Sequence, residues 1–287
     1  MRLGLAMLWA AAAGMGAAAQ ELPADSPLNV PAKSWAVACT KNEEAVILHP
    51  GSYLRYRQHQ VDEKGEQMRD EIETPKGTVA RTIGRDGRLL TPEQDAAERS
   101  RLKAMLGAPD DFERHVRRED QNRQKGLALL RLMPDAMTWS YVPGQPQRPD
   151  HRAGDPPLVV LDFKPDPKWS APSLEAEVLT GLEGRAWIDP RAQYVVHLEG
   201  RVTHAINIGW GLVAHIYPGG TVVLHQTNAG GQRWIVSSVD LRLTVRALLV
   251  KTVKQQTTFE TADYREVPAM SYQDAVRMLL ETPLPTR

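Results

Sequence analysis

The sequence has one cysteine, three phenylalanines and no excess of charge of either sign. Its 287 residues carry 35 basic and 35 acidic side chains. The single cysteine, Cys39, excludes an internal disulfide framework and any metal site built from several cysteines. Zero net charge argues against a protein that coats nucleic acid or an anionic membrane surface, although it leaves room for a local basic patch.

The short motifs of common enzymes are also absent. The chain contains no G-x-S-x-G, no H-E-x-x-H and no G-x-x-x-x-G-K-[ST]. Hydrophobic residues make up 42% and charged residues 24% of the chain, which is typical of a globular protein and not of a disordered one. We therefore expect a folded protein that is not an enzyme, carries no cofactor and does not bind nucleic acid.

The one long apolar run lies at the N-terminus, within residues 1–19. Arg2 precedes the apolar stretch Leu3–Ala13, and Ala17–Ala19 supplies the small residues that a signal peptidase requires. This pattern predicts a signal peptide cleaved after Ala19 and a periplasmic or secreted protein. No second run approaches the length needed to cross a membrane, so we expect the mature protein not to be integral to the membrane.

Cys39 is not the lipid-attachment residue of a lipoprotein, because it does not directly follow the predicted cleavage site. A lone cysteine in an exported protein is either buried or a free thiol. The apolar residues 36–38 that precede it favour burial.

The first half of the chain alternates between extended and helical patterns. Residues 20–34 contain three prolines and are expected to form an extended leader. Strands are predicted over 52–62, 67–74 and 78–83. Thr91-Pro92-Glu93-Gln94 is a strong helix start, since Thr91 can cap and Gln94 can close a capping box. It opens a charged helical pair over 91–133 that is interrupted near 107–109.

The second half is predominantly β. Strands are predicted over 137–142, 158–163, 184–189, 193–204, 209–217, 221–226, 233–240, 241–250 and 251–260, and a short amphipathic helix over 271–280. Residues 174–182 are ambiguous between a helix and an extended arm. The short turns between strands favour an antiparallel meander, and the chain is expected to be mainly β with some helix (α+β).

One stretch carries a family resemblance. Leu179–Asp189, which reads LTGLEGRAWID, and the following residues 195–201 resemble the G-x-x-W-I-D…E-G hairpin of exported bacterial proteins in the LolA/LolB-like, lipoprotein-sorting superfamily. Asp86–Gln94 and the charged helices after it resemble an uncharacterised branch of that group. The resemblance covers roughly residues 35–268, and its motifs are structural rather than catalytic.

The resemblance implies a LolA-like open β-barrel, in which a curved antiparallel sheet has helices on its concave side. Residues 35–268 would form this unit with the helical insertion 91–133, and residues 269–287 a C-terminal helix and tail. The best-known members hold acyl chains in the concavity. The resemblance therefore implies a carrier of a lipid or another apolar or amphipathic ligand.

Large aromatic side chains are the candidates for such a site. The residues selected as ligand-binding are Trp187, Tyr194, Trp210 and Trp234, which recur across the C-terminal strands. Core packing is the alternative role for each of them. In a curved sheet, a packed core and a ligand cavity would occupy the same face.

Four histidines offer the only alternative chemistry: His197, His204, His215 and His225 fall on successive predicted strands. No two of them have H-x-H spacing, and His197 shares its strand parity with Arg201, which predicts a solvated face. We therefore predict no metal site. The functional alternatives to a carrier are an envelope protein that binds another protein without a small ligand and, last, an enzyme of unrecognised type.

Overall fold

The computed structural model describes residues 26–152, 154–209, 212–231, 233–247 and 251–285. The strands are β1 (Tyr53–Asp62), β2 (Gly65–Thr74), β3 (Gly77–Arg85), β4 (Arg88–Leu89), β5 (Met137–Tyr141), β6 (Val159–Pro165), β7 (Leu182–Asp189), β8 (Tyr194–Val202), β9 (Ile206–Ile208), β10 (Ala214–Ile216), β11 (Thr221–Asn228), β12 (Trp234–Ala247) and β13 (Lys251–Val267). The helices are η1 (Pro27–Asn29), α1 (Ala32–Leu48), α2 (Pro92–Leu106), α3 (Pro109–Ala136), η2 (Glu175–Gly181) and α4 (Tyr272–Glu281).

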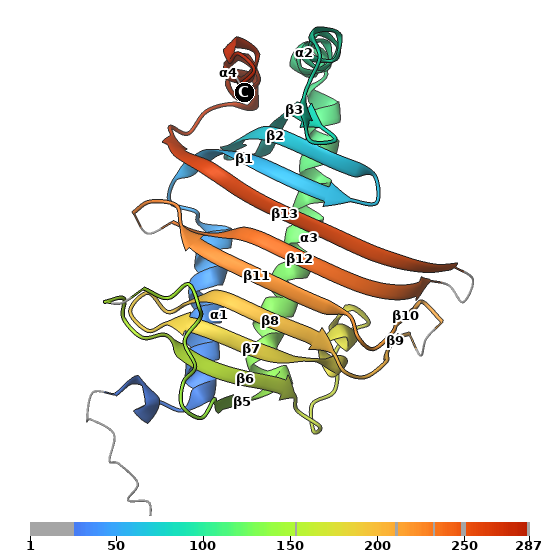
Figure 1. Cartoon of the computed structure of the whole chain (residues 1–287). Coiled ribbons are helices and arrows are strands. Elements are labelled where there is room, and N and C mark those ends of the chain that lie inside the picture. Colours follow the sequence, from blue (N-terminus) through green and yellow to red (C-terminus); the bar gives the residue numbers. More distant parts are fainter. Residues whose placement is uncertain (1–25, 153, 210–211, 232, 248–250, 286–287) are drawn as a thin grey trace, which may run out of the picture.

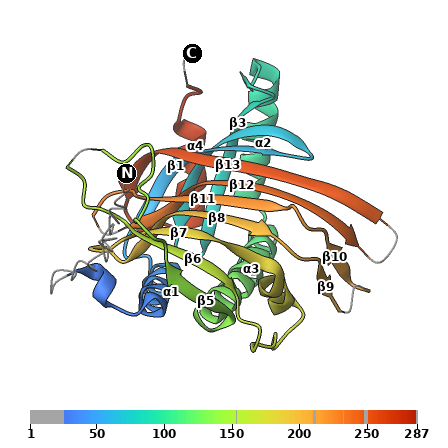
Figure 2. The same ribbon diagram turned by 60° about the horizontal axis from the view of Figure 1, so that its bottom comes forward.

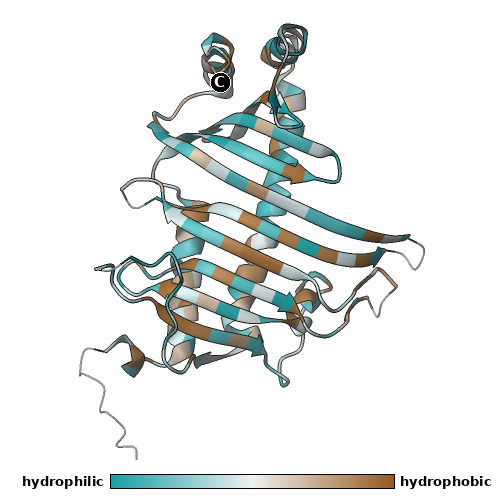
Figure 3. Ribbon diagram, in the orientation of Figure 1, coloured by the Kyte–Doolittle hydropathy of each residue, from teal (hydrophilic) through white to brown (hydrophobic). Residues whose placement is uncertain are grey.

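All these strands belong to one open antiparallel sheet of 13 strands. The order across the sheet is β4-β3-β2-β1-β13-β12-β11-β8-β7-β6-β5, with β9 and β10 attached to the end of β12. Most neighbours are also neighbours in sequence. The exceptions are β1 beside β13, β11 beside β8 and β10 beside β12. Along the strands, hydrophilic and hydrophobic residues alternate (Figure 3), as expected when the two faces have different surroundings.

Helices α1 and α3 lie on one face of the sheet (Figures 1 and 2), which we call the helix face. Helix α3 contacts β3 near one end of the sheet and β5 at the other. From Val116, which lies beside Gly77 at the start of β3, to Ala136 the helix rises only ~30 Å. Nine strand spacings separate β3 from β5 and would span ~43 Å in a flat sheet. The sheet therefore curves toward α3, and the helix face is concave.

Helix α2 covers the exposed edge of β3. The Glu98 carboxylate accepts a hydrogen bond from Thr82 N at 2.8 Å, and the Arg101 guanidinium donates to Ala80 O at 2.8 Å. These contacts occupy backbone groups that β4, with only two residues, leaves unpaired. A covered edge resists pairing with another chain.

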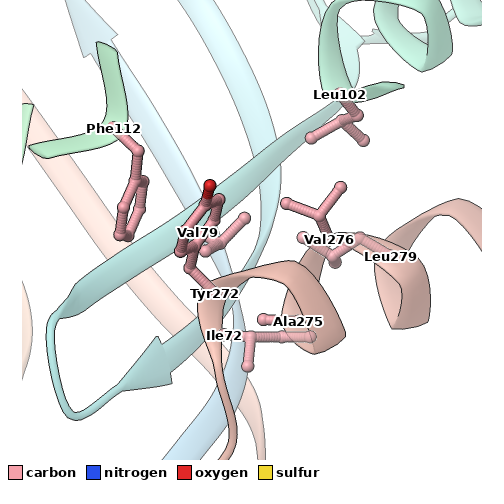
Figure 4. Packing of buried hydrophobic residues seen from close by; sticks show 8 residues of the cluster. All are labelled: Ile72, Val79, Leu102, Phe112, Tyr272, Ala275, Val276 and Leu279. Atoms are coloured by element: carbon pink, nitrogen blue, oxygen red, sulfur yellow. The ribbon is translucent and has the colours of Figure 1, made fainter. Parts of the chain in front are cut away.

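Helix α4 packs on the outer face of the same strands, opposite the helix face. A cluster of buried residues joins β2, β3, α2, α3 and α4 (Figure 4): Ile72, Val79, Leu102, Phe112, Tyr272, Ala275, Val276 and Leu279. The rings of Phe112 and Tyr272 stack with centroids 4.1 Å apart. Beside the cluster, the guanidinium of Arg81 has 0% exposure and bridges Asp95 to backbone carbonyls at the end of α4.

The motif behind the family resemblance has a structural explanation. A Cβ at Gly184 would lie 2.0 Å from Glu199 O and 2.8 Å from the ring of Phe163, so β7 can approach its neighbours only with glycine here. Asp189 accepts hydrogen bonds from the backbone N–H groups of Arg191 and Ala192, at 2.8 and 3.0 Å. These residues shape a strand and a turn, as the sequence predicted.

The predicted helical pair is confirmed as α2 and α3, and the capping box between Thr91 and Gln94 is present. Three predictions differ from the structure. Residues 209–217 were predicted as one strand, but of the described residues in this range only Ala214–Ile216 form one. The described part of the expected leader contains η1 and the start of α1, a helix that the sequence pattern did not indicate. Residues 233–240 and 241–250 were predicted as two strands, but Trp234–Ala247 is one. The predicted signal peptide, residues 1–19, lies outside the described residues.

Candidate ligand-binding cavity

A cavity of about 680 Å³ opens on the helix face, between α1, α3 and the strands β1, β12 and β13. Its size falls within the range of small-molecule sites. Its apolar and aromatic lining comprises Val46, Ile47, Leu48, Tyr53, Tyr56, Leu127, Trp234, Ile235, Val236, Phe259 and Tyr264. Gly126 of α3 also faces the cavity, and a Cβ there would have no atom within 4 Å. Gly126 is exposed, so this open space lies at the border of the cavity.

Two aromatic pairs form part of the wall. Tyr56 of β1 and Tyr264 of β13 have ring centroids 6.3 Å apart. Trp234 stacks on Tyr194 of β8, with centroids 5.0 Å apart and planes 12° from parallel. Tyr194 is fixed in turn by a hydrogen bond from its hydroxyl to Asn42 O of α1, at 3.3 Å. The aromatic surface is thus held by contacts within the protein.

Charged groups from α1, α3 and the sheet line the cavity: Glu43, Arg123, Glu73 and Arg233. The Arg233 guanidinium pairs with Glu73 at 3.0 Å, and its Nε is buried without a hydrogen-bond partner among the described residues. Glu73 also accepts a hydrogen bond from Leu54 N at 3.0 Å. Glu43 of α1 accepts a hydrogen bond from the Gln226 side chain at 2.9 Å. The cavity therefore combines an apolar wall with a small set of polar groups.

Burial raises the pKa of three ionisable groups in and beside the cavity. It raises the pKa of Glu43, although the hydrogen bond from Gln226 and the charge of Arg233 oppose the shift. The pKa of Glu71 is also raised by burial, against the hydrogen bond from Tyr56. The pKa of Tyr56 is raised well above its ordinary value by burial and by the charges of Glu71 and Glu73. Each shift favours the neutral form of the group, as expected in a poorly hydrated site.

The structure brings together two of the four aromatic residues selected from the sequence. Tyr194 and Trp234 stack on the helix face, and Trp234 lines the cavity. Trp187 does not belong to this site. Its neighbour Ile188 packs toward α1, so Trp187 points to the outer face, where its indole donates to Pro146 O at 2.9 Å. Trp210 lies outside the described residues.

His197 is buried on the outer face and not solvated as predicted. Its exposed fraction is 5%, because the loop 142–158 folds over this part of the sheet and contacts Trp187 and His225. The register between β7 and β8 is regular from Arg201 to His197 and shifts only beyond it, between Trp187 and Ile188. His197 and Arg201 therefore do share a face, and it is the covering loop that makes the prediction of a solvated His197 wrong.

The four histidines do not converge. His197 and His225 are neighbours, with ring centroids 4.3 Å apart. His204 and His215 have other partners, Thr203 at 3.0 Å and Asn207 at 2.7 Å. Within the part of the chain that the structure describes, no group of three or more His, Cys, Asp or Glu residues could hold a metal ion.

Sequence reasoning missed most of the cavity. Glu43 lies on the unpredicted helix α1, and the pairing that places Tyr56 beside Tyr264 joins the first and last long strands. Tyr56 and Gln58 do share one parity of their predicted strand, and both line the cavity. This shared parity is the one feature of the sequence that could have indicated which side of β1 lines the cavity.

The sequence matches no model of a known protein family, and it has no match among curated proteins. Among the described residues, no helix contains a stretch long and apolar enough to span a membrane.

Proposed function

We propose that this protein binds an apolar or amphipathic ligand, such as an acyl chain, in the cavity between α1, α3 and the sheet. It would act as a non-enzymatic carrier of the bacterial envelope with a LolA-like fold. The observation that carries the proposal is the cavity of about 680 Å³ on the helix face, with its aromatic and aliphatic lining. The curved, open antiparallel sheet with two helices on its concave face supports the fold assignment.

An apolar chain in this cavity would gain binding energy from the surface that it removes from water. Each buried methylene contributes ~0.8 kcal/mol before the costs of ordering. Tyr56, Phe259 and Trp234 provide flat surfaces for such contacts. The charged group of Arg233 and Glu73 lies on the same cavity wall and would meet the polar end of the ligand.

Gly126 allows a direct test. Gly126→Phe would place a ring at the border of the cavity, where it can obstruct the opening, whereas Gly126→Ala adds one methyl group and changes the helix backbone in the same way. We expect Gly126→Phe to abolish the fluorescence response to a titrated fatty acid and Gly126→Ala to retain it. Both variants should fold, since removing glycine from a helix interior favours the helix by up to ~1 kcal/mol.

Trp234 supplies the second readout. Its indole lines the cavity, so ligand binding should shift and quench its emission. The response should disappear in Trp234→Phe and persist in Trp187→Phe, because Trp187 lies on the outer face. Mass spectrometry of the native protein would show whether a lipid is bound on purification. A flat titration of the unaltered protein would contradict the proposal and leave the alternative, an envelope protein that binds other proteins.

A further inference from the structure

An exposed apolar patch lies at one corner of the sheet, away from the cavity. Leu174, Leu212 and Val213 are 48%, 58% and 47% exposed. Isolated exposed hydrophobic residues are common, but several together mark a surface for a partner or a membrane.

Three contacts bring these residues to the same corner. Gly209, at the end of β9, donates from its N–H to the Glu177 carboxylate of η2 at 2.8 Å. Leu174, directly before η2, borders the same surface hollow as Gly209. Val213 lies against Gly209, where a Cβ would meet its side chain at 2.7 Å. Leu174 and Val213 thus both lie near Gly209, and Leu212 directly precedes Val213. We call Leu174, Leu212 and Val213 the apolar corner, although Leu174 is distant from the other two in sequence.

Basic residues lie next to the apolar corner. Strand β10 pairs with the end of β12, with His215 opposite Arg246 and Ala214 opposite Ala247. Across the next ladder, Ala247 lies opposite Lys251. Figure 1 shows these strand ends together, beside β9 and β10.

Basic residues predominate on the strands beside the apolar corner, whereas Glu175 and Glu177 lie on η2 and Asp240 pairs with Arg242 at 2.8 Å. Residues 241–259 contain Arg242, Arg246, Lys251 and Lys254 and no acidic residue, and residues 203–216 contain no acidic residue either. Lys251 and Lys254 are exposed, and neither forms an ion pair with a described residue. The carboxylate of Glu177, which borders the corner, is engaged by Gly209 N. A chain with no net charge thus concentrates positive charge beside exposed leucine and valine side chains.

We propose that the apolar corner and the adjacent lysines dock on an anionic membrane surface. Exposed apolar side chains would enter the headgroup boundary, and Lys251 and Lys254 would meet lipid phosphates. Apolar insertion and electrostatic attraction to anionic lipids are the two contributions that hold peripheral proteins at a bilayer. This positive charge fits the negative surface of such a bilayer. The proposal does not depend on a ligand in the cavity.

Sedimentation with lipid vesicles tests the proposal. The unaltered protein should bind vesicles that contain phosphatidylglycerol and phosphatidylcholine more tightly than vesicles of phosphatidylcholine alone, and salt should weaken the binding. Lys251→Gln with Lys254→Gln should reduce partitioning onto the anionic vesicles by about thirty-fold, given the usual contribution of each lysine. Leu212→Ser with Val213→Ser should reduce it by about tenfold or more.

Matched controls separate this surface from general charge and hydrophobicity. Lys64→Gln with Lys76→Gln removes the same charge at two distant turns, and Val37→Ser removes an apolar side chain on α1 that is 48% exposed. These variants should bind as the parent does, and so should Gly126→Phe. The proposal is wrong if the parent does not prefer anionic vesicles, or if the control variants lose as much binding as the corner variants.

Discussion

The imidazole rings of His197 and His225 lie 4.3 Å apart on the adjacent strands β8 and β11, beneath the loop 142–158. The Nε2 atom of His197 lies 2.9 Å from the Glu199 carboxylate, and the Nδ1 atom of His225 lies 3.2 Å from an Arg148 nitrogen. Arg148 belongs to the loop. The histidine pair is therefore part of the contact between the loop and the sheet.

This pair predicts a loss of stability on mild acidification. Burial, together with the charges of His197 and Arg148, lowers the pKa of His225. The unfolded chain, with a histidine pKa of about 6.5, then takes up a proton at a higher pH than the folded chain does. The free energy of unfolding should consequently fall as the pH drops below about 6.5. Urea unfolding at a series of pH values would measure the slope.

The variant His225→Gln isolates this contribution. Its glutamine can still accept a hydrogen bond from Arg148 but does not titrate. The free energy of unfolding should fall less steeply with decreasing pH in the variant than in the parent. Identical slopes would show that His225 has no part in the pH dependence.

Glu43 should contribute a pH dependence of the opposite sign: its contribution to the free energy of unfolding should fall as the pH rises. Its pKa is raised by burial, so the ionised form in the folded protein costs stability above that raised value. Glu43→Gln should stabilise the protein at neutral pH, and the gain should vanish at pH ~3, where the carboxyl is neutral in both the folded and the unfolded state. Denaturant unfolding at these two pH values measures the difference.

The neighbouring residue provides the control for Glu43. Glu44 pairs with Arg131 on the surface, at 2.5 Å. Glu44→Gln should instead cost up to ~1 kcal/mol at neutral pH. A gain of stability in Glu44→Gln equal to that in Glu43→Gln would contradict the assignment to burial.

Arg81 and Arg99 bind the same carboxylate but differ in burial. Arg81 is fully buried and contacts Asp95 at 2.6 Å, whereas Arg99 is 34% exposed and contacts Asp95 at 2.8 Å. Arg81→Met removes the buried donor of Asp95 and of two backbone carbonyls and leaves Asp95 with Arg99 alone, so we expect a loss of ~3–5 kcal/mol. Arg99→Met should cost ~1 kcal/mol or less.

A second substitution would confirm the cause. Burial raises the pKa of Asp95, but the hydrogen bonds from Arg81 and Arg99 outweigh it and keep this pKa below its usual value. Adding Asp95→Asn to Arg81→Met should recover part of the lost stability, because it removes a charge that has lost its buried partner. A further loss would show that packing rather than charge dominates. Thermal unfolding of the three variants gives the comparison.

The thiol of Cys39 should be unreactive in the folded protein. It packs with Trp35, Val159 and Ile188, and burial, with the charge of Glu43, raises its pKa to about 12. At pH 8 about one thiol in ten thousand would be ionised, and the thiolate is the reactive form. Reaction with a disulfide reagent should be slow in buffer and fast in denaturant. Equal rates would indicate that the thiol is exposed.

The sequence predicted those elements whose signals are local. The capping residues Thr91 and Gln94 marked the start of α2, and the interruption near 107–109 marked the break between α2 and α3. Helix α1 was missed because its buried residues Trp35, Ala36 and Cys39 are few, and the other apolar residues are spread around the helix. A narrow apolar face gives a weak periodic signal.

The cavity could not be predicted, since its wall depends on long-range pairing and on irregular backbone. Tyr194 and Trp234 were selected because they are large and aromatic, and they do lie on the concave face. Trp187 was selected for the same reason and lies on the other face. The burial of His197 is explained by the loop above it, which contacts Trp187 and His225. The alternation of residues along a strand predicts neither the face on which Trp187 lies nor the burial of His197.

The pairing of β1 with β13 also sets an order of assembly. Tyr53 lies opposite Val267 and Val61 opposite Thr258, so one side of β1 has no partner until nearly the whole described chain has been synthesised. Until then, β1 to β3 can form only a separate three-stranded ribbon with an open edge. Pairing between such distant segments is slow to form and exposes edges meanwhile. A nascent chain that stops before β13 would be expected to yield two unjoined pieces of sheet and to be prone to aggregation.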